Sequence, residues 1–440
     1  MANPYLPNWE YIPDGEPRVF GERIYVYGSH DVVDSDYFCD YILKVWSAPV
    51  ENPSQWTCHG ISFRTRSKID NPSDVDWSEK QLYAPDVVYK DGKYYLYAYI
   101  LDSKGCVAVS DKPEGPFKLI SQYKYNIPNH YDKGTFIDPG VLVDDDGRVY
   151  VYCGYLGSYM CELNPDNMYE VIDGSYQENI IPVEEPFEFF EACSPRKIGD
   201  TYYLIYSPKR GCRLAYATSD KPTGPFKYRG FIVDNGIDYP GGNDHGSICK
   251  IKDQWYVFYH RMTNGTLFSR RGCVEKIEIL PDGSIPTVEM TSLGFEDSLN
   301  PYDITLAETA CVLKGNDDKI LITEFDSFTR VITKIIDGCV MGWKYFDFGD
   351  DYSSKTMTLE LKVIPRGCRS RVHVHIDSED GEEIGVIDVG YGDRIARGEV
   401  KLVTGRHSLF FVVEEGHTGW SKDAFLHREL FDLEAFVFRK

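Results

Sequence analysis

Four side chains suited to acid–base chemistry each stand at or near the start of a hydrophobic run. They are Asp14 before EPRVF, Asp138 before GVLV, Glu191 before ACSPRKI and His245 before GSICKI. Carboxyl groups gathered around one channel suit glycoside hydrolysis. One carboxylic acid protonates the leaving oxygen, while an ionised carboxylate draws a proton from water or attacks directly. A third carboxylate nearby can raise the pKa of the acid through like-charge repulsion.

These four positions keep register with a repeat. Tyrosine markers in the following strands recur after 70, 55, 53 and 53 residues, and each candidate stands about eleven positions before its marker. The second unit places Ala84-Pro85-Asp86 at the equivalent point. The markers are Tyr25, Tyr95, Tyr150, Tyr203 and Tyr256. Surface carboxylates without a role would not keep such a register, so the repeat itself selects the site candidates.

The repeat predicts the fold. A period near fifty, with about four short strands in each unit, is typical of a β-propeller. Each unit contains a hairpin signal, such as the apolar run after Asp138, the turn DDDG at 144–147 and the strand VYVY. Five units predict five blades over residues 4–290, and the long first step indicates an insertion at about 54–78. Because the innermost strand of each blade faces the central channel, the strand starts should converge there.

A different domain follows the repeats. The segment TSLGFEDSLNPY at 291–302 has no strand pattern and reads as a linker. Strands with a period of two then recur, for example TMTLELKVI at 356–364 and SLFFVVE at 408–414. The sequence therefore predicts an all-β protein: a five-bladed β-propeller followed by a β-sandwich of the jelly-roll kind at 303–440.

Composition limits the classes of partner. The chain holds 47 Lys and Arg against 69 Asp and Glu, a net charge of −22, which would repel nucleic acid. No apolar run reaches the ~20 residues that a membrane-spanning helix needs, and no signal peptide is visible. The 12 cysteines form no C-x-x-C pair, which argues against zinc and favours a reducing compartment. We therefore expect a cytoplasmic protein without membrane or nucleic-acid partners. The sequence does not predict the oligomeric state.

Residues 4–290 resemble glycoside hydrolase family 43. The motifs that carry the resemblance, in order, are IPDGEPRVFGERIYVYGSHD, LYAPDVVYKDGKYYLY, SDKPEGPF, IDPGVLVDDDGRVYVY, FEACSPRKIGDTYYLIYS and NDHGSICKIKDQWYVFYHR. The resemblance implies an inverting mechanism and action on arabinofuranosides or xylosides. The expected enzyme removes a terminal pentose, α-L-arabinofuranose or β-D-xylose, from plant-type oligo- and polysaccharides.

The resemblance also assigns roles. Asp14 matches the general base, Asp138 the acid that modulates pKa and orients, and Glu191 the general acid. His245 matches an axial histidine that lies beside a central, often water-coordinated, calcium in many members, so a structural calcium is compatible with the pattern, whereas no redox or nucleotide cofactor is required. Arg261 of YHR matches an arginine that lines the sugar pocket.

Two assignments rest on open alternatives. The family usually has Asp-Pro at the base, whereas Asp14 is followed by Gly15-Glu16-Pro17, and a two-residue slip would make Glu16 the base. Tyr83 and Phe190 flank inner-strand starts and are candidates for a sugar-stacking wall, with core packing an equal interpretation.

The C-terminal part resembles carbohydrate-binding module family 6 more loosely. The matching segments are GWKYFDFG at 342–349, VTGRHSLFFVV at 403–413 and LFDLEAFVF at 430–438. Such modules bind glycans on aromatic platforms, for which Trp343 and Trp420 are the candidates here, against an ordinary place in the core.

Other functions compete with this interpretation. A β-galactofuranosidase is hard to separate, because furanose pockets differ little in sequence. Five-bladed fructosidases carry Asn-Asp-Pro-Asn-Gly and Arg-Asp-Pro, which this chain lacks. A catalytically inactive glycan-binding propeller is suggested by the altered motif around Asp14. Protein-interaction propellers rarely place acids at three inner-strand starts. Aryl glycosides of xylose, arabinofuranose and galactofuranose would separate these classes.

Overall fold

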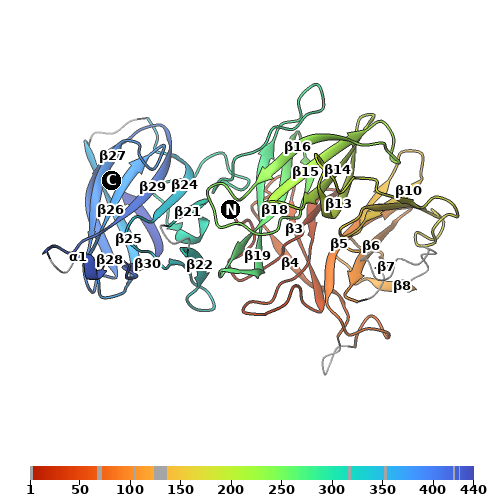
Figure 1. Ribbon diagram of the computed structural model, residues 1–440, viewed down its shortest axis with the longest axis horizontal. Coiled ribbons are helices and arrows are strands. Elements are labelled where there is room, and N and C mark those ends of the chain that lie inside the picture. The colour runs from red at the N-terminus through yellow and green to blue at the C-terminus, as the bar shows by residue number, and fades with distance from the viewer. Residues whose placement is uncertain are drawn as a thin grey trace.

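The computed structural model describes residues 3–66, 72–102, 105–122, 136–315, 319–350, 354–419, 422–425 and 427–440. The chain forms two strand-rich bodies side by side, with the N-terminal two thirds in one and the C-terminal third in the other (Figure 1). Within the described ranges the helical elements are the 3-10 turn η2 (Ala307–Thr309) and α1 (Lys422–Phe425), and neither could span a membrane. The predicted all-β fold, a propeller followed by a sandwich, is confirmed.

The first body is a five-bladed propeller in which each blade is one antiparallel sheet. The strands of blades one and two are β1 (Glu16–Phe20), β2 (Arg23–Tyr27), β3 (Ile42–Pro49), β4 (Thr57–Arg64), β5 (Leu82–Lys90), β6 (Lys93–Ile100), β7 (Gly105–Ser110) and β8 (Lys118–Gln122). Those of blades three to five are β9 (Gly140–Val143), β10 (Val149–Cys153), β11 (Tyr159–Leu163), β12 (Gln177–Glu178), β13 (Phe189–Ile198), β14 (Thr201–Pro208), β15 (Arg213–Ser219), β16 (Lys227–Asp234), β17 (Ser247–Ile251), β18 (Gln254–Thr263) and β19 (Thr266–Ile277). The innermost strands, β1, β5, β9, β13 and β17, surround the axis.

The tyrosine markers explain why the repeat is so regular. Tyr150 and Tyr203 are buried to 1% and 2% exposure, and their rings contribute to apolar clusters made of residues from neighbouring blades. Burial of such large apolar surfaces is the main stabilising term in a fold without helices. The hairpin turn between β9 and β10 closes with the Asp144 amide donating to the Arg148 carbonyl, and Gly147 takes the required positive φ of 84°.

Two buried arginines fasten the propeller axis. Arg18 on β1 donates to both carboxylate oxygens of Asp86 on β5, at 3.0 and 2.6 Å, and to the Val141 carbonyl on β9 at 3.1 Å. Arg196 on β13 donates to Glu16 on β1 at 2.7 Å and to the Ile248 carbonyl on β17 at 2.9 Å. These contacts therefore link the inner strands of all five blades below the strand starts.

The N-terminal segment closes the ring against the last blade. The side-chain amide of Asn3 donates to the Val274 carbonyl at 2.8 Å, and the Val274 backbone amide donates back to the Asn3 side-chain oxygen at 2.9 Å. The Tyr5 amide donates to the Gly272 carbonyl at 3.2 Å. Blade five, which has three strands of its own (β17, β18 and β19) among the described residues, thus gains an additional edge partner.

The predicted insertion is in a different place. Residues 57–64 lie inside the proposed insertion but form β4, the outer strand of the first blade. The additional length of the first repeat comes instead from the connections 28–41 and 65–81, before β3 and after β4. The sequence did not predict this strand, because the region is polar and rich in turn residues and the strand lies at the edge of its blade.

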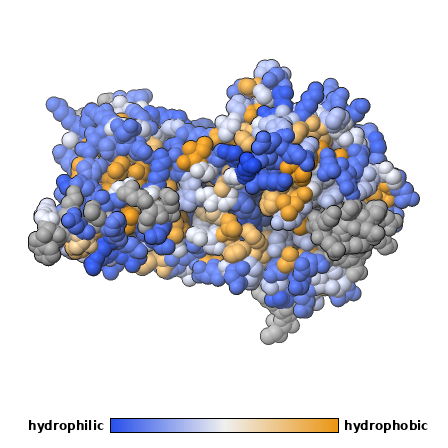
Figure 2. Space-filling view, in the orientation of Figure 1, coloured by the Kyte–Doolittle hydropathy of each residue, from blue (hydrophilic) through white to orange (hydrophobic). Residues whose placement is uncertain are grey.

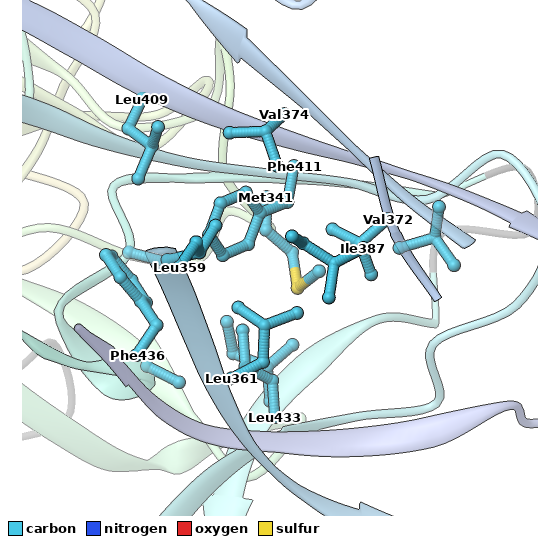
Figure 3. Packing of buried hydrophobic residues seen from close by; sticks show 14 of the residues in the cluster. Met341, Leu359, Leu361, Val372, Val374, Ile387, Leu409, Phe411, Leu433 and Phe436 are labelled. Carbon is cyan, nitrogen blue, oxygen red and sulfur yellow. The ribbon is translucent and has the colours of Figure 1, made fainter. Parts of the chain in front are cut away.

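The second body is a sandwich of two sheets. One sheet has the order β22-β23-β30-β25-β28 with β20 paired to β30, and the other has the order β21-β24-β29-β26-β27. The strands are β20 (Thr305–Leu306), β21 (Val312–Lys314), β22 (Leu321–Glu324), β23 (Arg330–Thr333), β24 (Val340–Asp347), β25 (Thr356–Pro365), β26 (Ser370–Ile376), β27 (Glu383–Val389), β28 (Ile395–Lys401), β29 (Arg406–Glu415) and β30 (Phe431–Arg439). Figure 3 shows how side chains such as Leu361, Phe411 and Leu433 fill the space between the two sheets.

Trp343 belongs to this core. Its side chain is fully buried at 0% exposure and packs against Phe411 and Phe436, with ring centroids 5.0 and 4.7 Å away. The prediction that Trp343 could form a glycan platform is therefore wrong, because no face of its ring reaches solvent. Trp420, the other candidate, lies outside the described residues.

Candidate active site

The predicted acids converge at one end of the propeller. Asp14, Asp138, Glu191 and His245 line one pocket of about 480 Å³, to which all five blades contribute residues. Asp14 and Asp138 adopt left-handed backbone conformations, with φ of 57° and 53°. Glu191 lies at a bulge of β13, where the pairing with β14 shifts register on both sides of it. Such irregular backbone at strand starts turns side chains out of the sheet and into the pocket.

Asp14 is held as a carboxylate. Burial alone would raise its pKa, but the Arg270 guanidinium, with smaller contributions from His245, His260 and the Ser29 hydroxyl, lowers the pKa to about 2. Arg270 donates to Oδ1 at 2.8 Å and Ser29 donates to Oδ2 at 2.6 Å. Asp14 is consequently ionised at neutral pH and can accept a proton.

Glu191 and Asp138 are held in the opposite state. Burial, together with the negative charge of Asp14, raises the pKa of Glu191 to about 7. Burial, followed by repulsion from Glu191 and Asp14, raises the pKa of Asp138 well above its usual value. One carboxylate that is ionised and two carboxyl groups that tend to keep protons therefore share one pocket. This difference in pKa separates a base from an acid.

Two histidines pack beside Asp14. His245 is buried, and its Nδ1 lies 3.6 Å from Asp14 Oδ1 and 3.8 Å from Asp138 Oδ2. The Asp14 amide donates to His260 Nδ1 at 3.3 Å, while His260 Nε2 lies 3.0 Å from the Asn243 carbonyl. These contacts fix a neutral tautomer with the proton on Nε2. Burial, helped by the charge of Arg270, lowers the pKa of His260 to about 3, so this imidazole stays neutral.

The pocket wall is aromatic. Tyr83 packs edge to face on Tyr99 with centroids 5.8 Å apart, and Phe190 packs on Tyr155 at 5.1 Å. All four rings line the pocket. Tyr83 and Phe190 are partly buried, so each ring both packs against a neighbour and faces the cavity. An apolar ring surface of this kind suits the CH-rich face of a sugar.

The arginine that lines the pocket is Arg270, whereas the sequence predicted Arg261. Arg261 is 2% exposed and donates to the carbonyls of Ala310 at 2.7 Å and Glu308 at 2.5 Å in the second domain. It does not line the pocket, so its predicted role there is wrong. Arg261 lies directly opposite Arg271 on β19 and shares its face, whereas Arg270 is on the other face and points to the pocket.

Glu16 does not reach the pocket. It lies below the pocket, where its Oε2 accepts from Arg196 at 2.7 Å, and it does not line the cavity. Counting back from the tyrosine marker without a gap thus selects the carboxylate that faces the pocket, Asp14. The two residues differ in place because Glu16 is already inside β1, whereas Asp14 precedes it.

The described residues do not build a calcium site from protein groups. Calcium takes six to eight oxygen ligands, but no three His, Cys, Asp or Glu side chains in the described ranges are grouped to hold a metal ion. Glu16 Oε1 is a buried oxygen without a hydrogen-bond partner. However, the axis around it already carries the guanidinium groups of Arg18 and Arg196. We therefore derive no step through a metal.

Sequence reasoning missed the residues that tune Asp14. Arg270 also pairs with Asp31: both carboxylate oxygens of Asp31 accept hydrogen bonds from the Arg270 guanidinium, each at 2.9 Å. His260 completes the set around Asp14, while Asn243 accepts from His260 and hydrogen-bonds to Glu191. The repeat marks the starts of inner strands, whereas these residues lie on the third strand of the last blade, in loops and near the end of β18. The doublet Arg270-Arg271 in SRRG was the available signal, since adjacent arginines on one strand must face opposite sides.

A propeller hub that presents an ionised carboxylate and a protonated one across an aromatic pocket is the arrangement of a glycoside hydrolase. The model of glycosyl hydrolases family 43 matches residues 56–285. A xylosidase/arabinosidase of Thermoclostridium stercorarium is 39% identical over 93% of this chain and 95% of its own length. The chain belongs to glycosyl hydrolase family 43.

Solved structures agree with the fold. A family 43 β-xylosidase/α-arabinofuranosidase from a compost metagenome, solved with xylotriose in a calcium-free form, is 30% identical with a TM-score of 0.54, over 64% of this chain and 96% of its own. A Bacillus subtilis arabinoxylan arabinofuranohydrolase has a TM-score of 0.57 at 24% identity, over 100% of this chain and 97% of its own. The latter likeness extends the shared fold across both domains. The resemblance of the second domain to carbohydrate-binding module family 6 stays a prediction.

Proposed function

We propose that this protein is an inverting exo-glycosidase that removes terminal α-L-arabinofuranose or β-D-xylose from plant-type oligo- and polysaccharides. The observation that carries the proposal is that Asp14, Asp138 and Glu191 line one pocket, in which Arg270 pairs with Asp14 while burial raises the pKa of Glu191. The names of the similar proteins support the choice of pentoses. The pocket, bounded by residues of all five blades, suits a single sugar at a chain end.

Each carboxyl group has one task in this mechanism. Glu191 donates its proton to the leaving oxygen, and Asp14 accepts a proton from the water that attacks the anomeric carbon. Asp138 keeps a proton on the Asp138–Glu191 pair, because like charges disfavour ionisation of both. Arg270 keeps Asp14 ionised until water gives up its proton.

Inversion follows if the water fits between the base and the sugar. Inverting enzymes hold their two carboxyl groups roughly 6.5–9.5 Å apart, and retaining enzymes hold them at about 5–5.5 Å. Asp14 and Glu191 come from blades one and four, so their carboxyl groups approach the pocket from different sides. This arrangement supports the wider spacing and a water nucleophile.

NMR of the first-formed product tests the proposal. Aryl glycosides of xylose, arabinofuranose and galactofuranose are offered to the protein, and the anomer released first is recorded before mutarotation. Cleavage of a pentoside with inversion supports the proposal. If the protein prefers the galactofuranoside, the proposed pentose is wrong. If the first product retains the anomeric configuration, the inverting mechanism is wrong. If no substrate is cleaved, the result supports the alternative of a catalytically inactive glycan-binding protein.

The same proposal places the enzyme in the cytoplasm, without a redox or nucleotide cofactor. The 12 cysteines form no disulfide in the structure, and eleven of them are buried. Unpaired buried thiols behave as small apolar side chains and suit a reducing compartment.

A further inference from the structure

A hairpin of the second domain exposes two phenylalanine rings beside the propeller. β22 and β23 are joined by the turn 325–329, in which Phe325 is 56% exposed and Phe328 is 79% exposed. Figure 1 shows this hairpin projecting from the side of the second domain that meets the propeller. A turn at a domain surface is ordinarily polar, so two solvated rings in one turn point to a surface that binds something.

The turn is rigid. Asp326 Oδ1 accepts from the amides of Phe328 and Thr329 at 2.9 and 2.8 Å, and Arg330 donates to the Asp326 carbonyl at 3.0 Å. Arg330 itself is buried and pairs with Glu324. The two rings therefore extend from a fixed frame, which lowers the entropy cost of binding a ligand.

The propeller holds the hairpin from two sides. On one side the Asn8 side chain donates to the Phe328 carbonyl at 2.6 Å, and Arg330 donates to the Tyr11 hydroxyl at 3.1 Å. On the other side the Asn264 amide in the β18–β19 turn donates to the Ile322 carbonyl at 2.7 Å. The hairpin thus bridges the segment before β1 and the turn before β19.

Both anchoring segments lead directly to the pocket. Tyr11 lies three residues before Asp14, and Asn264 lies three residues before Leu267, which lines the pocket and is 42% exposed. Trp9, next to the anchoring Asn8, is 47% exposed and packs on Trp46 with centroids 5.7 Å apart. We call the exposed side chains of Trp9, Leu267, Phe325 and Phe328 the junction strip.

An interrupted apolar surface lies in the middle of the molecule (Figure 2). Figure 2 shows apolar residues reaching the surface in the middle of the molecule, between the domains, within a largely hydrophilic exterior. Single exposed apolar residues need no explanation. Here, however, two rings in one fixed turn, a tryptophan and a pocket-lining leucine stand on segments that are hydrogen-bonded to each other.

Charge narrows the choice of occupant. At a net charge of −22, a second copy of this chain or an anionic polymer would be repelled. A neutral polysaccharide meets no such repulsion, and its sugar rings have CH-rich faces that stack on aromatic side chains. The position of the junction strip beside the pocket also favours a polysaccharide. A polymer whose terminal pentose enters the pocket must continue across the surrounding surface.

We infer that the junction strip binds the main chain of a neutral, xylan-type polysaccharide while its terminal or branching pentose occupies the pocket. This inference rests on the proposed function for the identity of the sugar. It makes the second domain part of the substrate-binding surface through the hairpin, independently of any platform elsewhere on that domain.

The test compares a polymer with a small substrate. The Phe325→Ala/Phe328→Ala variant is assayed on soluble arabinoxylan and on the aryl pentoside that the wild type cleaves. We expect kcat/KM for the polymer to fall about tenfold, as truncation of central aromatic contacts does, with kcat/KM for the aryl pentoside unchanged. Phe328→Tyr should keep polymer activity. Tyr391→Ala removes an equally exposed ring, 56%, from the distant β27–β28 connection and should change neither activity.

Binding without turnover separates this inference from the proposed function. In native gels that contain arabinoxylan, wild type and Tyr391→Ala should be retarded and Phe325→Ala/Phe328→Ala should not, even if no pentoside is cleaved. Equal polymer-to-aryl activity ratios in all variants, or equal retardation, would overturn the inference. Sedimentation supplies a further check. If wild type is a dimer that the double substitution dissociates while polymer retardation persists, a second copy covers the strip and the inference is wrong.

Discussion

Arg270 should set the acid limb of the pH–rate profile. Its guanidinium lies between two buried carboxylates, donating to Asp14 at 2.8 Å and to Asp31 at 2.9 Å. Replacing Arg270 alone would leave Asp31 buried without its cation, a change that strongly destabilises a fold. The informative perturbation is therefore Arg270→Gln combined with Asp31→Asn, with Asp31→Asn alone as the matched control that keeps the cation on Asp14.

The size of the effect follows from the geometry. Two unit charges at 2.8 Å interact by roughly 6 kcal/mol at an effective dielectric constant of 20. At 1.36 kcal/mol per pKa unit, this is a ceiling of about 4 units. Water that enters the site and the remaining hydrogen-bond donors to Asp14 make the real effect smaller than this ceiling. We therefore expect the pKa of Asp14 to rise by about 1–3 units, as a single neighbouring charge commonly causes. The pKa of Asp14 would then move from about 2 to roughly 3–5.

The sign is fixed by the role of Asp14. A base must be ionised, so kcat/KM rises as pH passes the pKa of Asp14, and raising that pKa moves the limb to higher pH. We expect wild type and Asp31→Asn to keep full kcat/KM at pH 5, whereas the double variant loses activity below about pH 5. The assay is kcat/KM for an aryl pentoside between pH 3 and 9, with circular dichroism at each pH to confirm folding.

One result would refute this reasoning. If the folded double variant keeps the wild-type acid limb and loses activity uniformly across pH, Arg270 acts on the substrate and not on the ionisation of Asp14. A shift in Asp31→Asn equal to that in the double variant would instead assign the effect to Asp31.

Three further predictions concern the acid, the axis and metals. Glu191→Gln should lower kcat on natural linkages by about 10²–10⁴-fold, because the leaving oxygen loses its proton donor. In the wild type, kcat/KM should fall as pH rises above about 7, the pKa of Glu191. If Glu191→Gln keeps the same fall in kcat/KM at high pH, Glu191 is not the acid. Arg196→Met should lower the free energy of unfolding, measured with urea, by about 3–5 kcal/mol, because it leaves Glu16 buried and unpaired. The double variant Glu16→Gln/Arg196→Met should recover part of this lost stability. Millimolar EDTA should leave Tm unchanged, because arginine–carboxylate pairs hold the axis; a fall that calcium reverses would place an ion beside His245.

The sequence predicted the parts of the site that obey the repeat. Asp14, Asp138, Glu191 and His245 could be found because each stands just before or within the first residues of an inner strand, and inner strands must converge on the axis. The same rule could not find Arg270, which lies on a third strand whose facing depends on its pairing register with β18. Register is a tertiary property, and a one-residue change moves every side chain to the opposite face.

Two errors have related causes. Arg261 is the last residue of a recognisable motif, but β18 extends to Thr263 and carries this side chain into the domain junction. A strand's length beyond its motif depends on what it meets, in this case the second domain. Trp343 could not be classified from sequence because residues 340–344 of β24 are all buried, so no alternation of buried and exposed residues marks its face; its ring lies on the face toward the core.

The contacts of Arg261 and Arg271 mean that the catalytic part is not a transferable module. Glu308 in the C-terminal part is the counter-ion of Arg271, and the two terminal nitrogens of Arg261 donate to the carbonyl groups of Glu308 and Ala310. A gene truncated after the propeller would remove the hydrogen-bond acceptors of Arg261 and the counter-ion of Arg271. Engineers who exchange glycan-recognition partners in chimeric enzymes should therefore carry η2 along with the hydrolase, or neutralise both arginines at once.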